Sequence, residues 1–257
     1  MLHANRTRAE SFGAVAELYD RIRPSYPPEL VAALLSDGAH AVLDVGAGTG
    51  IAASLFAQAG CEVLAVEIDA RMAAVAAAKG IEVEVAPFER WDDRGRRFDL
   101  VTSAQAWHWV VPLAGATKAA EVLLPGGVFA AFWNLGEPPQ EIHEALDPVY
   151  ARLAPELASN SLAPNRSQGR VGDTGLGLAA SGAFEPEQER WFSWTRAYDS
   201  ASWVDLLRTH SDHQTLPPQR LESLLQAVAE AIDAAGGSFE MRLDTVLVSA
   251  RRRLIAA

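Results

Sequence analysis

The first half of the chain alternates short apolar runs with stretches in which apolar residues recur at helical spacing. Runs that are continuous or strictly alternating predict strands at 41–45, 62–67, 81–85, 97–103 and 128–133. The stretches between them predict helices, with glycine stops at Gly60 and Gly80. Strands that alternate with helices form a parallel sheet with right-handed crossovers. The pattern therefore predicts an open α/β domain whose ligand site lies at the carboxyl ends of the strands.

The second half of the chain departs from this rhythm. Helices are expected at 139–153, 201–208 and 216–235, and strands at 190–194 and 238–250, with a mobile glycine-rich loop at 167–182. The two late strands bring the sheet to seven strands. Trp191 and Trp194, which lie in the first of them, can line a substrate pocket or belong to the core, and we expect the core. We expect an open, mostly parallel sheet with helices on both faces.

Composition narrows the choice of partners. The 257 residues are 49% hydrophobic and carry a formal net charge of −11, which disfavours nucleic acid and anionic membranes as partners. A single cysteine, Cys61, excludes an internal disulfide and a cysteine-built metal cage. No apolar run approaches the ~18 residues of a membrane span, and the first residues lack the apolar segment of an export signal. We expect a cytoplasmic protein, whose oligomeric state stays open.

The first predicted strand runs directly into a glycine loop, Gly46-x-Gly48-x-Gly50. Glycines let the backbone turn tightly and approach a ligand closely, next to the positive end of the following helix. A P-loop would need Gly-Lys-Ser/Thr here, but Ile51 follows. Ile51 also stands where a dinucleotide loop has its last glycine, which disfavours a nicotinamide cofactor. A loop that admits the amino-acid part of S-adenosylmethionine fits the spacing better.

The segment 42–50, Val-Leu-Asp-Val-Gly-Ala-Gly-Thr-Gly, resembles motif I of the class I S-adenosylmethionine-dependent methyltransferases. Glu67, seventeen residues after Gly50, matches the family's acidic residue that binds the ribose hydroxyls. A carboxylate suits this role because it can accept both hydrogens of a diol. The segments 98–101 and 124–127 resemble the family's fourth strand and the turn before its fifth. The resemblance covers residues 15–135 and implies a Rossmann-like fold with S-adenosylmethionine as cofactor.

Four segments are expected within this architecture. Residues 1–40 form a helix and an arm that act as a lid, and residues 41–135 form the S-adenosylmethionine-binding core. Residues 136–185 form a helical and glycine-rich insert that caps the substrate. Residues 186–257 complete the sheet with strands and helices.

Finer features resemble the small-molecule methyltransferases of the ubiquinone and trans-aconitate type. Tyr19-Asp20 and the segment 23–27 are similar to their N-terminal arm, and the segment 104–109 is similar to the stretch after their fourth strand. The chain departs from many members after the third strand, where Ala86-Pro87-Phe88-Glu89 stands in place of an Asp-Ala pair. The Phe88 backbone and the Glu89 side chain are the substitutes expected to contact the adenine amino group.

The residues expected to bind the cofactor lie at the strand ends and in the arm. They are Asp44, Gly46, Ala47, Gly48, Thr49, Gly50, Glu67, Ile68, Phe88, Glu89, Gln105 and Arg23. Asp44 interrupts an apolar strand, where an unpaired charge is costly. It can cap loop N–H groups, lie near the methionine portion, or do both. Ile68 can pack on the adenine or belong to the core, and Arg23 can pair with a carboxylate or be solvated.

Two residues are candidates for catalysis, and one cluster is a candidate for metal binding. His108, flanked by Trp107 and Trp109, can act as a base or donate a structural hydrogen bond beneath the pocket. Tyr19 can fold over the cofactor together with the arm. His210-x-x-His213 with Asp212 has the spacing of metal ligands on a helix. Because no other ligand cluster accompanies it and surface histidines are frequent, we expect no metal.

The expected function is in-line transfer of a methyl group to a small-molecule acceptor. The sulfonium of the cofactor already makes the methyl group electrophilic, so the protein contributes alignment and exclusion of water. A base is needed only if the acceptor must lose a proton. One alternative is a non-catalytic protein that binds the cofactor and has a blocked acceptor pocket above Gln105 and His108. A less favoured alternative is a nicotinamide-dependent reductase.

Overall fold

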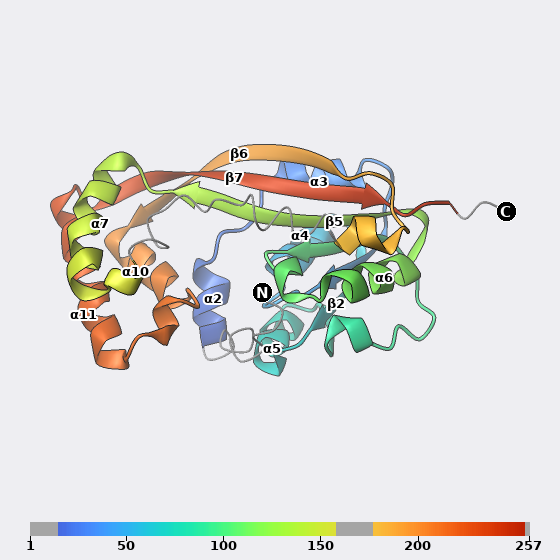
Figure 1. Ribbon diagram of the computed structural model, residues 1–257, viewed down its shortest axis with the longest axis horizontal. Coiled ribbons are helices and arrows are strands. Elements are labelled where there is room, and N and C mark those ends of the chain that lie inside the picture. Colours follow the sequence, from blue (N-terminus) through green and yellow to red (C-terminus); the bar gives the residue numbers. More distant parts are fainter. Residues whose placement is uncertain (1–14, 158–176, 255–257) are drawn as a thin grey trace.

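A seven-stranded sheet forms the centre of the molecule (Figure 1). The computed structural model describes residues 15–157 and 177–254. The strands are β1 (Ala41–Val45), β2 (Glu62–Glu67), β3 (Glu82–Val85), β4 (Phe98–Ala104), β5 (Leu123–Glu137), β6 (Gln188–Asp199) and β7 (Ser238–Arg251). Their order is β3-β2-β1-β4-β5-β7-β6, in which β1 to β5 run parallel and β7 pairs antiparallel with both β5 and β6. The expected open, mostly parallel sheet is confirmed.

Helices cover both faces of the sheet. They are α2 (Ala16–Ile22), α3 (Pro28–Leu35), α4 (Ile51–Gln58), α5 (Ala70–Ala78), α6 (Pro112–Val122), α7 (Gln140–Leu153), α10 (Ser200–Arg208) and α11 (Pro218–Ala234), with short 3₁₀ helices η3 (Phe88–Arg90), η4 (Trp107–Trp109) and η5 (His213–Thr215). Successive residues of a strand point to opposite faces. Val42 therefore packs in the cluster that contains Phe56 of α4, whereas Leu43 packs in the cluster that contains Ala119 of α6.

Strand β5 is longer than the apolar pattern predicts. It begins at Leu123 and includes the residues expected to form a turn, and it continues past Trp133 to Glu137. The reason is its pairing with β7, which runs without interruption from Val128 to Glu137. A Cβ at Gly136 would lie 2.5 Å from Leu243 Cδ2, so the close approach of these strands depends on glycine there.

A second core covers the far ends of β6 and β7. It is formed by α7, α10 and α11, which lie together at one end of the long strands (Figure 1); we call these three helices and the turns between them the cap. Helix α2 lies between the cap and the rest of the sheet. Trp194 packs against this core, but Trp191 is 52% exposed on the edge strand β6. The expectation that both tryptophans are in the core is therefore wrong for Trp191, because side chains alternate along β6 and Trp191 points to the face that solvent reaches, opposite to Trp194.

The segments flanking the core also differ from expectation. Within the described residues that precede β1, which begin at residue 15, there are two helices, α2 and α3, where the pattern indicated one helix and an extended arm. Pro28 does not prevent the second helix because it occupies the first helical position, which needs no intrahelical N–H bond. Of the expected glycine-rich loop, the part up to residue 176 lies outside the described residues, and 177–181 form a helical turn with a buried Leu178. None of the described helices is both long and apolar enough to cross a membrane.

Candidate active site

The glycine loop connects the end of β1 to the start of α4. Gly46, Gly48 and Gly50 all have positive φ angles, of +66°, +57° and +77°. Residues that carry a side chain rarely adopt φ angles in this range, which explains why these three positions are glycines. Position 46 has a second constraint, since a Cβ there would lie 2.6 Å from Ala106 Cβ in the segment after β4. The loop is therefore folded tightly against the ends of two neighbouring strands.

Glu67 holds this loop at the end of β2. One oxygen of its buried carboxylate, Oε2, accepts the N–H of Gly48 at 2.7 Å, and Oε1 accepts the N–H of Asp69 at 2.8 Å. Burial raises the pKa of Glu67 above its ordinary value, against these backbone bonds, which lower it. Each carboxylate oxygen can accept more than one hydrogen bond. Glu67 thus orders the loop and keeps capacity to accept hydroxyl groups of a ligand.

Asp44 and Thr49 carry buried polar atoms that lack partners. Asp44 is fully buried, and its Oδ1 accepts the hydroxyl of Thr102 at 2.9 Å. Its Oδ2 and the Oγ1 of Thr49, which is 1% exposed, make no hydrogen bond within the described part of the chain. Burial raises the pKa of Asp44 to about 7, although the bond from Thr102 and the nearby backbone N–H of Ala53 oppose the shift. Buried polar atoms are normally satisfied, so this pair points to a polar ligand at the glycine loop.

The residues expected around an adenine lie at the ends of β2 and β3. Ile68, directly after Glu67, is half-buried, as a residue that contacts a ligand would be. Phe88 is buried against Trp91, with ring centroids 6.4 Å apart, so only its backbone is available to a ligand. The carboxylate of Glu89 accepts the N–H of Val111 at 2.8 Å, just before α6 begins. Through that contact Glu89 caps the N-terminus of α6. Its expected contact with the adenine amino group stays a prediction.

Gln105 stands in a strained backbone conformation at the end of β4. Its φ is +56°, a value that few residues other than glycine adopt and that often marks a functional site. The side-chain amide donates to the carbonyl of Asn134 at 3.2 Å. Three residues further on, the His108 Nδ1 accepts the indole N–H of Trp133 at 3.4 Å. The segment after β4 is therefore tied to β5 at two points, and a role for His108 as a base stays a prediction.

The arm is fastened to both sides of the site. On the core side Asp20 pairs with Lys79 at 2.6 Å. On the cap side the Arg23 guanidinium donates to Thr209 Oγ1 at 2.8 Å and to the Thr209 carbonyl at 2.7 Å, and it lies 4.9 Å from the centre of the Tyr19 ring. The structure places the Arg23 guanidinium on a hydroxyl and a backbone carbonyl of the cap, and its pairing with a carboxylate of the cofactor or the substrate stays a prediction.

Comparison with known proteins decides the family. Residues 43–131 match the methyltransferase domain family. An uncharacterised methyltransferase of Mycobacterium tuberculosis is 31% identical over 265 residues, which cover 99% of this chain and 100% of the relative, and one from Mycobacterium bovis gives the same figures. The chain belongs to the methyltransferase family. It is a class I S-adenosylmethionine-dependent enzyme with a Rossmann-like fold, as the glycine loop and Glu67 indicated.

Solved methyltransferases share this fold. A candidate type II methyltransferase from Anaeromyxobacter dehalogenans has a TM-score of 0.62 at 22% identity, and the match covers 90% of this chain and 99% of the other. Phosphoethanolamine N-methyltransferase 2 of Haemonchus contortus, solved with S-adenosyl-L-methionine, has a TM-score of 0.52 at 14% identity. This match covers 97% of the present chain and 59% of the Haemonchus chain. At these identities the likeness concerns the fold, so the small-molecule branch of the methyltransferases stays a prediction.

Sequence reasoning missed two polar residues that contact the candidate site residues and the arm. Thr102 lies opposite Asp44 in the β1–β4 register and donates to it. Asn134 donates to the Ser25 carbonyl of the arm at 2.9 Å, and its Oδ1 accepts the Thr245 hydroxyl at 2.6 Å. Asn134 is a polar residue in an apolar stretch, the same signal that singled out Asp44, whereas Thr102 lies in a strand that also contains Asp99 and Ser103. That signal was available for Asn134, but the sequence alone did not supply the partners of either residue.

Proposed function

We propose that the protein transfers the methyl group of S-adenosylmethionine to a small-molecule acceptor held between the strand ends, the arm and the cap. The observation that carries this proposal is the pair of unpartnered buried atoms, Asp44 Oδ2 and Thr49 Oγ1, beside the glycine loop. The amino-acid part of the cofactor offers an ammonium group, which is the partner that a buried carboxylate oxygen requires. The residues present therefore fit the cofactor.

The remaining contacts of the cofactor fall to residues around the loop. The Glu67 carboxylate would accept the ribose hydroxyls while it still holds the Gly48 N–H at 2.7 Å. The absence of side chains at Gly46, Gly48 and Gly50 leaves the backbone open to close approach, and Ala47 adds only a methyl group. Ile68 and the Phe88 backbone would border the adenine. Together these residues would fix the position of the cofactor before an acceptor enters.

When bound, the cofactor supplies an electrophilic methyl group. The protein's own part is to align the acceptor with that group and to keep water out. Gln105 and His108, which follow β4, are held against β5 and would form one wall of the acceptor site. Because His108 Nδ1 accepts the Trp133 N–H, the neutral ring carries its own proton on Nε2. A role as base would therefore use the lone pair of Nδ1, and the ring would have to give up the Trp133 bond to take a proton there.

The placement of the arm favours a small acceptor. Helix α2 is fastened to the core through Asp20 and Lys79 and to the cap through Arg23 and Thr209, so it spans the space between them. An arm fastened on both sides would cover an acceptor bound beneath it, and a small molecule fits such a site better than a polymer. The formal net charge of −11 further disfavours nucleic acid as the methyl acceptor. Arg23 and Tyr19 would therefore act from the lid side of the site.

Isothermal titration with S-adenosylhomocysteine tests the cofactor site. Glu67→Gln should weaken binding at least tenfold, or about 1.4 kcal/mol, because an amide has only one oxygen for the ribose and the loop. Glu62→Gln is the matched control, since Glu62 lies on the same strand with its side chain 82% exposed, and it should bind as the wild type does. Wild-type affinity in Glu67→Gln would refute the assigned role.

Turnover separates the enzyme from its alternatives. The protein is incubated with S-adenosylmethionine and a panel of small acceptors, and release of S-adenosylhomocysteine is followed by mass spectrometry. Acceptor-dependent release is expected. Tight binding of S-adenosylhomocysteine without release on any acceptor would favour the non-catalytic alternative, and fluorescence quenching by NADPH but not by S-adenosylhomocysteine would favour a reductase.

A further inference from the structure

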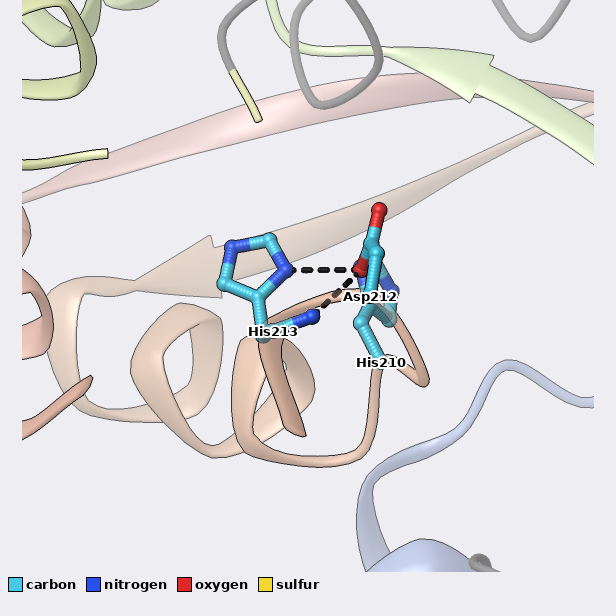
Figure 2. Close-up of side chains that lie close together, drawn as sticks. All are labelled: His210, Asp212 and His213. Carbon is cyan, nitrogen blue, oxygen red and sulfur yellow. Dashed lines mark hydrogen bonds and ion pairs between the residues drawn. The ribbon is translucent and has the colours of Figure 1, made fainter. Parts of the chain in front are cut away.

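A cluster of three metal-ligating side chains lies in the turn between α10 and α11. His210, Asp212 and His213 each offer one ligand atom, and these atoms all lie within 4.8 Å of one another. Figure 2 shows the Asp212 carboxylate next to the ring of His213, with His210 beside it. The methyl-transfer proposal uses none of these residues. The cluster is therefore an independent feature of the cap.

The burial of His213 changes the interpretation drawn from the sequence. No metal was expected because surface histidines are frequent, but His213 is fully buried. His210 is half-buried, and the Asp212 side chain is 26% exposed. The cluster thus has a fixed inner ligand and two outer ligands that an ion from solvent can reach. To bind an ion, only the side chains of the two outer ligands, His210 and Asp212, would need to move slightly.

The ring of His213 is held in the orientation that a metal ligand needs. Its Nδ1 lies 2.8 Å from Asp212 Oδ1, and its Nε2 lies 2.9 Å from the hydroxyl of the buried Tyr150. Histidines that bind metals commonly use the second ring nitrogen for such a hydrogen bond, which fixes the ring and its tautomer. Tyr150 therefore holds the ring so that Nδ1 of His213 faces the Asp212 carboxylate.

The distances fit a small divalent ion after a modest movement. Bonds of about 2.0–2.1 Å in a tetrahedral site place neighbouring ligand atoms about 3.4 Å apart. The pair formed by His213 and Asp212 is somewhat closer than this, at 2.8 Å, and every pair in the cluster lies within 4.8 Å. Rotation of the half-buried His210 side chain and a small opening of the Asp212–His213 pair would complete the geometry.

We propose that His210, Asp212 and His213 bind a divalent transition-metal ion such as Zn²⁺ in the cap of the protein. Two imidazoles and one carboxylate are ligands that Zn²⁺, Co²⁺, Ni²⁺ and Cu²⁺ prefer, whereas Mg²⁺ and Ca²⁺ prefer oxygen ligands alone. The ion braces the turn that joins α10 to α11. Thr209, which accepts both hydrogen bonds from Arg23 of the arm, directly precedes this turn. The ion therefore also stabilises the position at which the arm is bonded to the cap.

The test uses the untagged, full-length protein after removal of metal with a chelator. Co²⁺ is titrated and followed by its visible absorption, and Zn²⁺ and Mg²⁺ are titrated separately by calorimetry. One equivalent of Co²⁺ per chain should bind, Zn²⁺ should displace it, and Mg²⁺ should not. Failure to take up one equivalent, or equal competition by Mg²⁺, would overturn the proposal.

Variants assign the ligands. His210→Ala and Asp212→Asn change outer ligands and should weaken Co²⁺ binding at least tenfold. His40→Ala is the matched control, because His40 is an exposed histidine 3.7 Å from the carboxylate of Glu62 and should bind Co²⁺ as the wild type does. Wild-type affinity in both ligand variants would overturn the assignment. Calorimetry with S-adenosylhomocysteine checks that the variants are folded and reports on the methyltransferase site separately.

Discussion

Replacing Asp44 by asparagine should change the pH dependence of stability in a defined direction. In the cofactor-free fold burial raises the pKa of Asp44 to about 7, from 3.8 in an unfolded chain. Between these two values the folded state binds a proton that the unfolded state lacks, so wild-type stability falls as the pH rises from about 4 to about 7. Asparagine carries no such proton. The difference in free energy of unfolding between Asp44→Asn and the wild type should therefore grow with pH.

The magnitude follows from the pKa. From pH 5 up to the pKa of about 7, the free energy of unfolding of the wild type falls by about 1.36 kcal/mol per pH unit, and above the pKa it falls no further. The difference between Asp44→Asn and the wild type should therefore grow by about 3 kcal/mol between pH 5 and pH 8. The new amide hydrogens, which need acceptors in the core, cost about 1–3 kcal/mol, but this cost is the same at both pH values. Comparing the two pH values therefore removes it from the result.

Urea unfolding of the cofactor-free protein at pH 5 and pH 8 measures this difference. Asp147→Asn, which changes an exposed aspartate on α7, serves as the control and should show no pH-dependent gain. The same Asp44→Asn variant should bind S-adenosylhomocysteine at least tenfold more weakly, because the ammonium loses its carboxylate partner. If Asp44→Asn gains the same stability at both pH values, Asp44 does not carry a buried charge and the reasoning fails.

Two further substitutions test the loop and the arm. Gly46→Ala should destabilise the fold by about 2–4 kcal/mol in urea unfolding, because it combines a positive φ with a Cβ placed 2.6 Å from Ala106 Cβ. Gly60→Ala is the control: Gly60 also has a positive φ, but a Cβ there would have nothing within 4 Å, so the substitution should cost about 1–2 kcal/mol. Equal costs for the two substitutions would contradict the packing argument. Arg23→Ala should weaken S-adenosylhomocysteine binding and speed limited proteolysis of the arm, because both hydrogen bonds to the cap are lost. Arg21→Ala, whose side chain is 67% exposed, should leave both measurements near wild type, and a matching effect would deny Arg23 a special role.

Much of the fold could be predicted from the sequence because its signals are local. The alternation of apolar runs and helices located the strands, and the loop after Val45 gave the position of the site. The ends of the strands could not be predicted in the same way. Strand β5 extends through Gly136 because β7 pairs with it, and that partner lies more than a hundred residues away in the sequence. Pairing over such a separation leaves no local pattern.

The candidate site was predictable to a similar degree. Asp44 could be named because it interrupts an apolar strand, and Glu67 because its spacing from the glycine loop resembles that of the ribose-binding acid in the methyltransferase family. Arg23 could be named, but its contact with Thr209 depends on how the cap folds back against the arm. The same reason explains His213, which the sequence placed at the surface and the structure buries beside Tyr150. Residues whose surroundings come from distant segments exceed what a local pattern can predict.

A crystal structure of the protein with S-adenosylhomocysteine would show directly where the cofactor binds. We expect the amino group of the ligand at Asp44 Oδ2 and the ribose hydroxyls at the Glu67 carboxylate, with the glycine loop at 46–50 between them. A nucleoside bound elsewhere, with Asp44 Oδ2 still without a partner, would contradict the assignment of this loop as the cofactor site.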